Sequence, residues 1–259
     1  MILAASKPFH TPEAGELFNF APLYDGAPEW LTYPMVVMTV VTVLVGVFFW
    51  RAFAKPKVVP GGVQNLAEAG VDFVQKQIAF PVMGPDVGRS WTPFLTVMFF
   101  WVLGLNLVGI IPGIQFPITS RIAIPAMLSG IAWLIYNAIG IKSQGLVGYF
   151  KNIMFPPGVP APIYFLLAPI ELVSTIIIRP LTLALRLFAN MVAGHLLLAV
   201  LFIATGVFFA SGIGKVTFLL PLGFGAIMMG FEIFVATMQA FIITILTAVY
   251  ISGAQEAHH

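Results

Sequence analysis

Long runs of apolar residues alternate with short polar segments along most of the chain. An apolar run of about 20 residues crosses the ~30 Å hydrocarbon core of a bilayer as an α-helix. The runs therefore predict an all-α membrane protein with about five membrane-embedded helices. The expected helices are three single spans followed by two longer segments: 33–53, 93–111, 122–141, 163–210 and 216–252.

The segment between the first two spans has a different pattern. From Val63 to Ile78, apolar residues fall on one face of a helix and polar residues on the other. Such a helix is expected to lie on the membrane surface instead of crossing it. We therefore predict one amphipathic interfacial helix at 63–78, within a single helical membrane domain at 33–259. Residues 1–32, which contain several acids and prolines, are expected to form a polar extracytoplasmic lead-in.

The last two apolar segments are too long to stand upright in a bilayer. A continuous helix of ~30 to 40 residues is ~45 to 60 Å long, whereas the hydrocarbon core is only about 30 Å thick. Few prolines interrupt either segment. We therefore expect a steeply tilted hairpin instead of broken helices.

Composition agrees with this picture and excludes several classes of protein. Hydrophobic residues make up 59% of the chain and charged residues 8%, against roughly 25% charged residues in soluble domains. A net charge of +2 without a basic run argues against nucleic acid as a partner. Because cysteine is absent and the histidines are scattered, we expect no metal site. The sequence contains no phosphate-binding loop or catalytic triad, so we expect no cofactor and no catalytic site.

Basic residues at the ends of the spans predict how the chain is oriented. Arg51, Lys55 and Lys57 follow the first span, and Lys142 and Lys151 follow the third. Short cytoplasmic loops collect lysine and arginine. We therefore expect the N-terminus outside and the C-terminus in the cytoplasm.

Several ionisable and amide side chains interrupt the two long apolar segments. Each charge there costs about 2.5 to 3.5 kcal/mol on insertion scales, and such residues mark ion paths or proton relays. Arg179 is expected to mark the cytoplasmic edge of the membrane. The full set of candidates is Glu171, Arg179, Arg186, Asn190, His195, Glu232 and Gln239.

Arg186 is the most informative of these residues. Its guanidinium stays cationic in a membrane, so it needs a polar cavity or an anionic partner. No carboxylate lies three or four residues away, which places the partner on another helix or another chain. Asn190 lies on the same helical face, where its amide could orient the guanidinium. The alternative is an arginine that reaches the membrane surface or forms a structural salt bridge.

His195 and Glu232 form a second expected pair. They lie on different long segments, and an imidazole and a carboxylate can share a proton near neutral pH. A single membrane histidine also serves as a structural hydrogen-bonding group, which is the alternative. Gln239 is seven residues beyond Glu232 and therefore lies on the same helical face.

These residues fit two classes of membrane protein. One is a subunit that provides an ion path to a partner. The other is a self-contained channel or secondary transporter, in which Arg186 binds an anionic substrate near the midplane of the bilayer. Such transporters commonly contain internal repeats, and we find none in this sequence.

Two motifs resemble subunit a of the F-type ATP synthase. The first is RPLTLALRLFANMVAGH at 179–195, and the second is QAFIITILTAVYI at 239–251. An earlier stretch, NLVGIIP at 106–112, is also similar. The resemblance covers nearly the whole chain from the first span onward.

The resemblance implies a role for each matched residue. Arg186 would face a carboxylate of the rotating c-ring and would separate two half-channels. Glu171 would line the cytoplasmic half-channel, although its spacing to Arg179 is one residue longer than in many relatives. Asn106 and Arg179 would have minor or structural roles. The half-channel open to the outside would be lined by Asn190, His195, Glu232 and Gln239.

The resemblance also implies a function and partners. The chain would be the proton-conducting stator subunit of ATP synthase, with no catalytic site of its own, and would couple proton flow to ring rotation and ATP synthesis. Its partners would be the c-ring, subunit b of the peripheral stalk, the lipid bilayer and, indirectly, the catalytic head. The tilted hairpin would face the c-ring in a bacterial plasma or inner membrane, or in an energy-transducing organelle membrane.

Overall fold

The computed structural model describes residues 28, 31–111, 122–155, 161–210 and 219–255. Every regular element in these residues is helical, which confirms the predicted all-α fold. Five helical stretches within them are long and apolar enough to cross a membrane. The predicted lead-in at 1–32 lies almost entirely outside the described residues.

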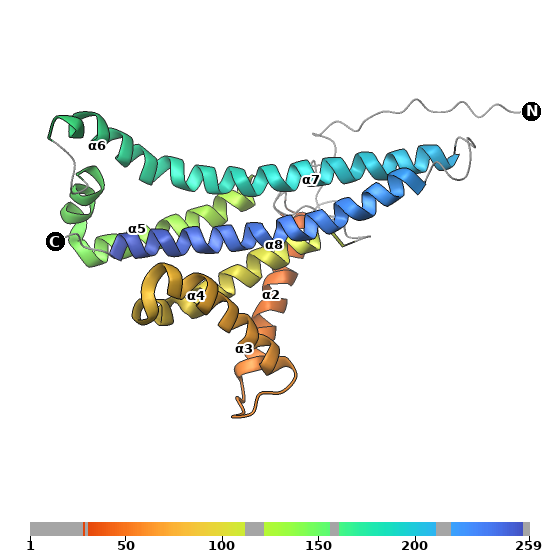
Figure 1. The fold of residues 1–259 in the computed structure, drawn as a ribbon, viewed down its shortest axis with the longest axis horizontal. Helices are drawn as coiled ribbons and strands as arrows, with labels where there is room; N and C mark the ends of the chain where they lie inside the picture. Colours follow the sequence, from red (N-terminus) through yellow and green to blue (C-terminus); the bar gives the residue numbers. More distant parts are fainter. Residues whose placement is uncertain (1–27, 29–30, 112–121, 156–160, 211–218, 256–259) are drawn as a thin grey trace, which may run out of the picture.

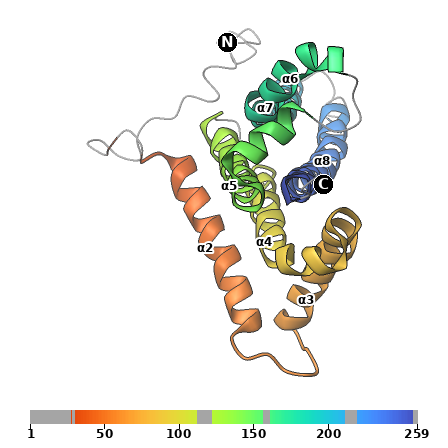
Figure 2. The ribbon, with the colours of Figure 1, turned by 90° about the vertical axis from the view of Figure 1, so that its left-hand side faces the viewer.

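Helix α2 (Tyr33–Phe53) has the bounds expected from its apolar run. Most of its side chains are not buried, and large apolar ones such as Leu44 and Trp50 are exposed. This pattern suits a helix with lipid on most sides, because lipid tails are as apolar as leucine. The contact with the next span includes a hydrogen bond from Trp101 Nε1 to Thr42 Oγ1 of 2.9 Å. Figure 2 shows α2 to one side of the other helices.

The second stretch begins with the predicted amphipathic segment and continues into the next span. Helix α3 (Val63–Val74) continues through η1 (Gln75–Ala79) into α4 (Phe80–Val108). The segment η1 is a wide turn, that is, a π-helical turn in which backbone N–H groups donate to carbonyls five residues back. The chain bends at Gly84, whose φ of 74° lies in the left-handed region that glycine adopts readily. Helix α4 begins before residue 93, the expected start of the span. Pro93 therefore lies inside the helix and not in its first turn, where proline is most common.

The third span extends beyond its expected end. Helix α5 (Ala123–Met154) continues past residue 141 and turns back at Gly145, where φ is 73°. Tyr149 then packs against Gly140 so closely that a β-carbon at position 140 would overlap the tyrosine ring. The segment expected to be a basic loop is therefore helical on both sides of a sharp bend.

The two long apolar segments form two long helical stretches. The first comprises the short turn η3 (Ala161–Ile163), α6 (Tyr164–Val173), the wide turn η4 (Ser174–Ile178) and α7 (Arg179–Ala210). The second is α8 (Leu219–Gln255). Helices α7 and α8 lie side by side in opposite directions along the long axis of the molecule (Figure 1).

The hydrophobic core lies where α4, α5, α7 and α8 meet (Figure 2). Its buried side chains include Leu105 from α4, Ala132 from α5, Leu187 from α7 and Ile251 from α8. Closely packed interiors move little. The core therefore fixes the polar residues of α7 and α8 relative to α4 and α5.

Candidate functional site

A small cavity with a mostly apolar surface and four polar lining residues lies between α7, α8 and the end of α4. Asn190 on α7 donates a hydrogen bond from Nδ2 to Gln239 Oε1 on α8 at 2.9 Å. Asn106 and Glu232 line the same cavity, whose volume is about 30 Å³. This is enough for a water molecule, which needs roughly 10 to 15 Å³ of cavity volume. The structure thus brings four residues singled out in the sequence to one place.

Glu232 is held against a glycine of the neighbouring helix. Its carboxylate oxygen Oε1 occupies the space where a β-carbon of Gly194 on α7 would lie, so a larger residue there would displace the carboxylate. The other oxygen, Oε2, is buried and has no hydrogen-bond partner among the described residues. Leaving a buried polar atom unpaired costs about 1 to 3 kcal/mol. The carboxyl group is therefore closely packed on one side and still able to bind a proton or a polar group on the other.

Gln239 is the most deeply buried polar residue of this cavity, with 3% of its surface exposed. Its Oε1 accepts the hydrogen bond from Asn190, and its Nε2 has no partner in the described part of the chain. The amide Nε2 is a donor, whereas an ionised Glu232 is an acceptor. The two side chains therefore offer one unused donor and one unused acceptor.

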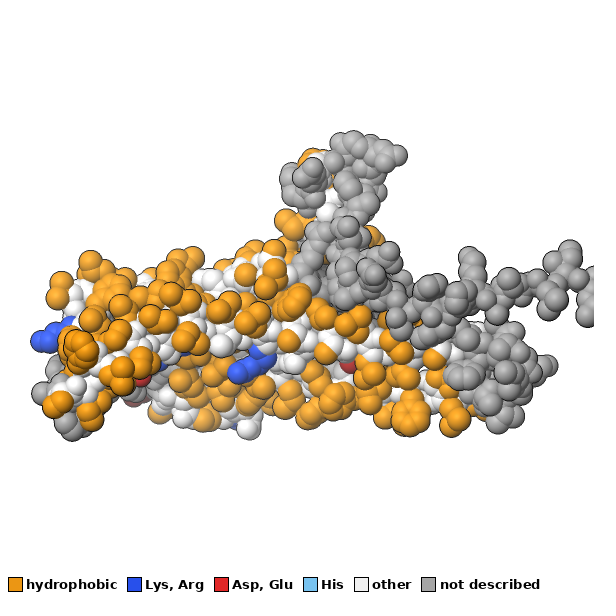
Figure 3. Space-filling model, turned by 90° about the horizontal axis from the view of Figure 1, so that it is seen from above, with side chains coloured by type: hydrophobic (Ala, Val, Ile, Leu, Met, Phe, Trp, Pro, Cys, Tyr) orange, Lys and Arg blue, Asp and Glu red, His pale blue; other side chains and the backbone are white. Residues whose placement is uncertain are grey.

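Arg186 lies on α7, four residues before Asn190. Its side chain is exposed and forms no hydrogen bond or ion pair with any residue that the structure describes. The expected contact with Asn190 is not formed, because Asn190 bonds to Gln239 across the helix pair. Leucines 181, 185 and 197 of the same helix are exposed too. Seen from above, this face of the molecule is largely hydrophobic (Figure 3).

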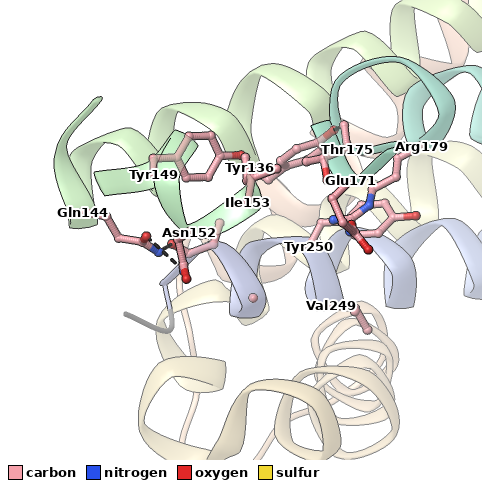
Figure 4. A pocket seen from close by; sticks show the side chains of 12 residues that line it. Tyr136, Gln144, Tyr149, Asn152, Ile153, Glu171, Thr175, Arg179, Val249 and Tyr250 are labelled. Atoms are coloured by element: carbon pink, nitrogen blue, oxygen red, sulfur yellow. Dashed lines mark hydrogen bonds between the residues drawn. The ribbon is translucent and has the colours of Figure 1, made fainter. Parts of the chain in front are cut away.

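A second, larger cavity of about 410 Å³ lies where α5 and α8 end and α7 begins. Glu171 lines it from α6, Thr175 from η4 and Arg179 from α7. Figure 4 shows Glu171 and Arg179 directed into the same space beside Tyr250. The two charged groups are not in direct ion-pair contact. The cavity therefore has room for a mobile polar species between them.

The sequence did not single out the tyrosines and amides of this second cavity. The Arg179 guanidinium lies over the Tyr250 ring, 5.2 Å from its centroid, a favourable cation–π contact. The remaining polar side chains come from α5: Tyr136, Gln144, Tyr149 and Asn152. A signal for them exists, because tyrosines and amides within apolar sequence must also find polar partners.

The predicted residues thus separate into two groups with Arg186 outside both. Glu171 and Arg179 line the larger cavity, and Asn190 and Glu232 line the smaller one. His195 lies in α7 directly after Gly194, but its side chain is outside the described part of the structure. Its pairing with Glu232 therefore stays a prediction.

Comparison with known proteins identifies the family. Residues 35–252 match the family model described as ATP synthase A chain. The chain is 40% identical over 255 residues to ATP synthase subunit a of Rhodococcus erythropolis, an alignment that covers 98% of this chain and 93% of that protein. It is 47% identical over 218 residues to the subunit of Frankia alni, with coverage of 81% and 72%. The corresponding values for Streptomyces lividans are 40% over 248 residues, 93% and 86%. The chain therefore belongs to the ATP synthase A chain family.

Proposed function

We propose that this chain is the stator subunit that conducts protons through the membrane sector of an ATP synthase. Membership of the family and five helices able to cross a membrane support a role in proton transport and ATP synthesis in a cell membrane. The observation that carries the detailed mechanism is the separation along α7 of two cavities that each contain ionisable side chains. An exposed and unpaired Arg186 lies between them in sequence.

The outer half of the path is the smaller cavity. Protons enter from outside, bind at Glu232 and pass to a carboxylate of the c-ring. His195 shares the proton with Glu232, since an imidazole and a carboxylate can share one proton between them. The unused hydrogen-bonding atoms of Glu232 and Gln239 support this route, because a relay needs donors and acceptors that the protein itself does not saturate.

The inner half of the path is the larger cavity. Each c-subunit carboxylate carries its proton through the lipid in neutral form and releases it near Glu171. Moving one elementary charge through 100 mV yields about 2.3 kcal/mol, so several protons must be coupled to the synthesis of one ATP. The offset cavities support this mechanism, because a proton can travel from one to the other only on the ring.

Arg186 separates the two halves. Its fixed positive charge repels a proton that would pass directly between the cavities, and it stabilises the ionised carboxylate of the ring opposite. The exposed apolar face of α7 around it supports a contact with an apolar partner helix. The partners in this proposal are the c-ring, subunit b of the peripheral stalk and, indirectly, the catalytic head.

The larger cavity opens toward the cytoplasm in this proposal. Ser143 Oγ and Gln144 Nε2 both donate hydrogen bonds to the Ala254 carbonyl at 3.0 Å. The end of α8 therefore lies beside the basic end of α5, which is expected to be cytoplasmic. This arrangement supports a cytoplasmic C-terminus and an outside N-terminus.

The lengths of α7 and α8 support a tilted hairpin against the c-ring. With 32 and 37 residues, they are about 48 and 56 Å long at ~1.5 Å per residue. Both exceed the ~30 Å hydrocarbon core. Helix α2, whose 21 residues suit an upright span, runs across their direction in Figure 1.

Replacement of Arg186 tests the proposal. Arg186→Ala should abolish ATP-driven proton pumping in inverted vesicles and should raise passive proton flux after the catalytic head is removed. Arg186→Lys keeps the positive charge, but lysine lacks the planar guanidinium and its ammonium group is strongly hydrated. This variant should therefore fail to pump while still blocking most of the passive proton flux. Arg89→Ala is the control, because Arg89 is exposed and lines neither cavity.

Two outcomes would contradict the proposal. Normal pumping by Arg186→Ala would show that the arginine does not separate two half-channels. Purification of the chain with a bound anionic solute and without a c-ring would favour a self-contained transporter.

A further inference from the structure

The wide turn η4 changes the direction in which Glu171 points. In an uninterrupted α-helix, the eight steps from Glu171 to Arg179 turn through about 800°, which leaves the side chains about 80° apart. A wide turn accommodates one extra residue. The rotation from Glu171 to Arg179 is then close to that of seven α-helical steps, about 700°, which is about 20° short of two full turns. Glu171 and Arg179 therefore point into the same cavity (Figure 4).

The same turn leaves one backbone carbonyl without a donor inside the helix. The Arg179 N–H donates to the Ser174 carbonyl, five residues back. It is therefore not the donor for Thr175, four residues back, as it would be in an α-helix. The next residue, Pro180, has no N–H. The Thr175 carbonyl thus needs a donor from another element, because buried carbonyls are almost always paired.

Tyr136 on α5 supplies this donor. Its hydroxyl donates a hydrogen bond to the Thr175 carbonyl at 2.8 Å, and the two residues are 3% and 4% exposed. The Tyr136 ring packs against Tyr250, with centroids 5.4 Å apart. Tyr250 in turn lies against the Arg179 guanidinium. Tyr136 therefore bonds directly to η4 and contacts, through Tyr250, the arginine that follows the turn.

We propose that Tyr136 is a positioning residue whose hydroxyl keeps η4 wide and thereby keeps Glu171 directed into the larger cavity. Without this donor, the Thr175 carbonyl is buried and unpaired, and α6 rotates to pair it differently. The rotation carries the Glu171 side chain away from Arg179 and out of the cavity. The consequence for proton release rests on the proposed function, whereas the direction of Glu171 is measurable by itself.

The absence of cysteine from the chain makes this direction measurable in membranes that contain the whole complex. Glu171→Cys and Ile170→Cys are made separately, and inverted vesicles are treated with a charged, water-soluble maleimide. Ile170 is exposed and does not line the cavity. Because thiol reactivity follows access to water, the thiol at position 171 should react about tenfold faster than the one at position 170.

Tyr136→Phe removes only the hydroxyl, and we expect it to bring the two rates to within about twofold of each other. Tyr149→Phe is the matched control. It removes a hydroxyl from the same cavity, but that hydroxyl donates to Asn137 and not to η4, so the ratio should not change. A ratio unaffected by Tyr136→Phe overturns the proposal. An equal fall in both variants also overturns it, because it indicates a general loosening of the cavity.

A reversible version of the experiment applies if Tyr136→Phe does not accumulate. A fluorinated tyrosine at position 136 keeps the ring and loses its hydroxyl proton at lower pH than tyrosine does. Raising the pH then removes the donor from a protein that is already assembled. Once the absorbance of the fluorinated side chain shows that it has lost its proton, the ratio of rates should fall and should recover on return to low pH. An unchanged ratio after this ionisation overturns the proposal. Failure of the proposed function is a separate result, namely normal proton pumping by Glu171→Gln.

Discussion

At the scale of single residues, the contact between Gly194 and Glu232 leaves little room for change. A methyl group at position 194 would occupy the place of Glu232 Oε1, so the carboxylate must move. We expect Gly194→Ala to slow ATP-driven acidification of inverted vesicles about tenfold, equivalent to about 1.4 kcal/mol. Adding Glu232→Asp shortens the acid by one methylene and should restore part of the rate.

Gly206→Ala is the matched control for this substitution. Gly206 lies on the same helix, and a β-carbon there meets no atom within 4 Å. It should therefore pump normally. Equal rates for the Gly194 and Gly206 variants would show that the close packing of the carboxylate does not matter for proton transfer.

The sequence identified polar residues of both cavities but not their contacts. Ionisable and amide groups in apolar sequence often mark ion paths, so Glu171, Glu232 and Gln239 stood out. Helical spacing placed Asn190 on the face of Arg186, but spacing within one helix says nothing about the register between two helices. The hydrogen bond from Asn190 to Gln239 depends on that register.

At the scale of elements, the apolar runs located the helices but not their irregularities. The run at 33–53 ends where α2 ends. The bends at Gly84 and Gly145 lie in polar segments between the predicted spans, where the length of an apolar run does not distinguish a loop from a bent helix. The wide turn η4 reads Ser-Thr-Ile-Ile-Ile, a composition that does not distinguish it from the helices around it.

Deletion of Ile177 tests whether η4 accommodates one surplus residue. The Arg179 N–H would then reach the Ser174 carbonyl as an ordinary α-helical bond, and Glu171 would keep its direction. Ile177 is exposed, so its loss removes little packing. We expect the deleted protein to pump at no less than about half the normal rate, because a wide turn is equivalent to one inserted residue.

Deletion of Leu181 is the contrasting change. Leu181 is also exposed but lies in regular helix between Arg179 and Arg186. Its loss rotates the larger cavity's residues by about 100° relative to Arg186, and pumping should be abolished. Comparable losses from the two deletions would contradict the role assigned to η4.

At the scale of the whole molecule, the positions of the basic residues predict which ends face the cytoplasm. Cysteines introduced at Lys57 and Lys142, both exposed, should react with an impermeant thiol reagent in inverted vesicles only. A cysteine at Ile111, which is exposed just beyond the end of α4, should react only from the opposite side. Labelling of position 57 or 142 from outside would reverse the proposed orientation.

The unpaired state of Arg186 also bears on how the complex is made. Within the described residues nothing neutralises this charge, and a charge in the membrane costs about 2.5 to 3.5 kcal/mol on insertion scales. A newly synthesised subunit is destabilised in the membrane by this amount until an anionic partner binds near Arg186. We expect the subunit to be degraded quickly in cells that lack subunit c, and Arg186→Leu to lengthen its lifetime there in a pulse-chase measurement. Arg186 would then also determine the order in which the complex assembles, because this subunit would become stable only after the ring has formed.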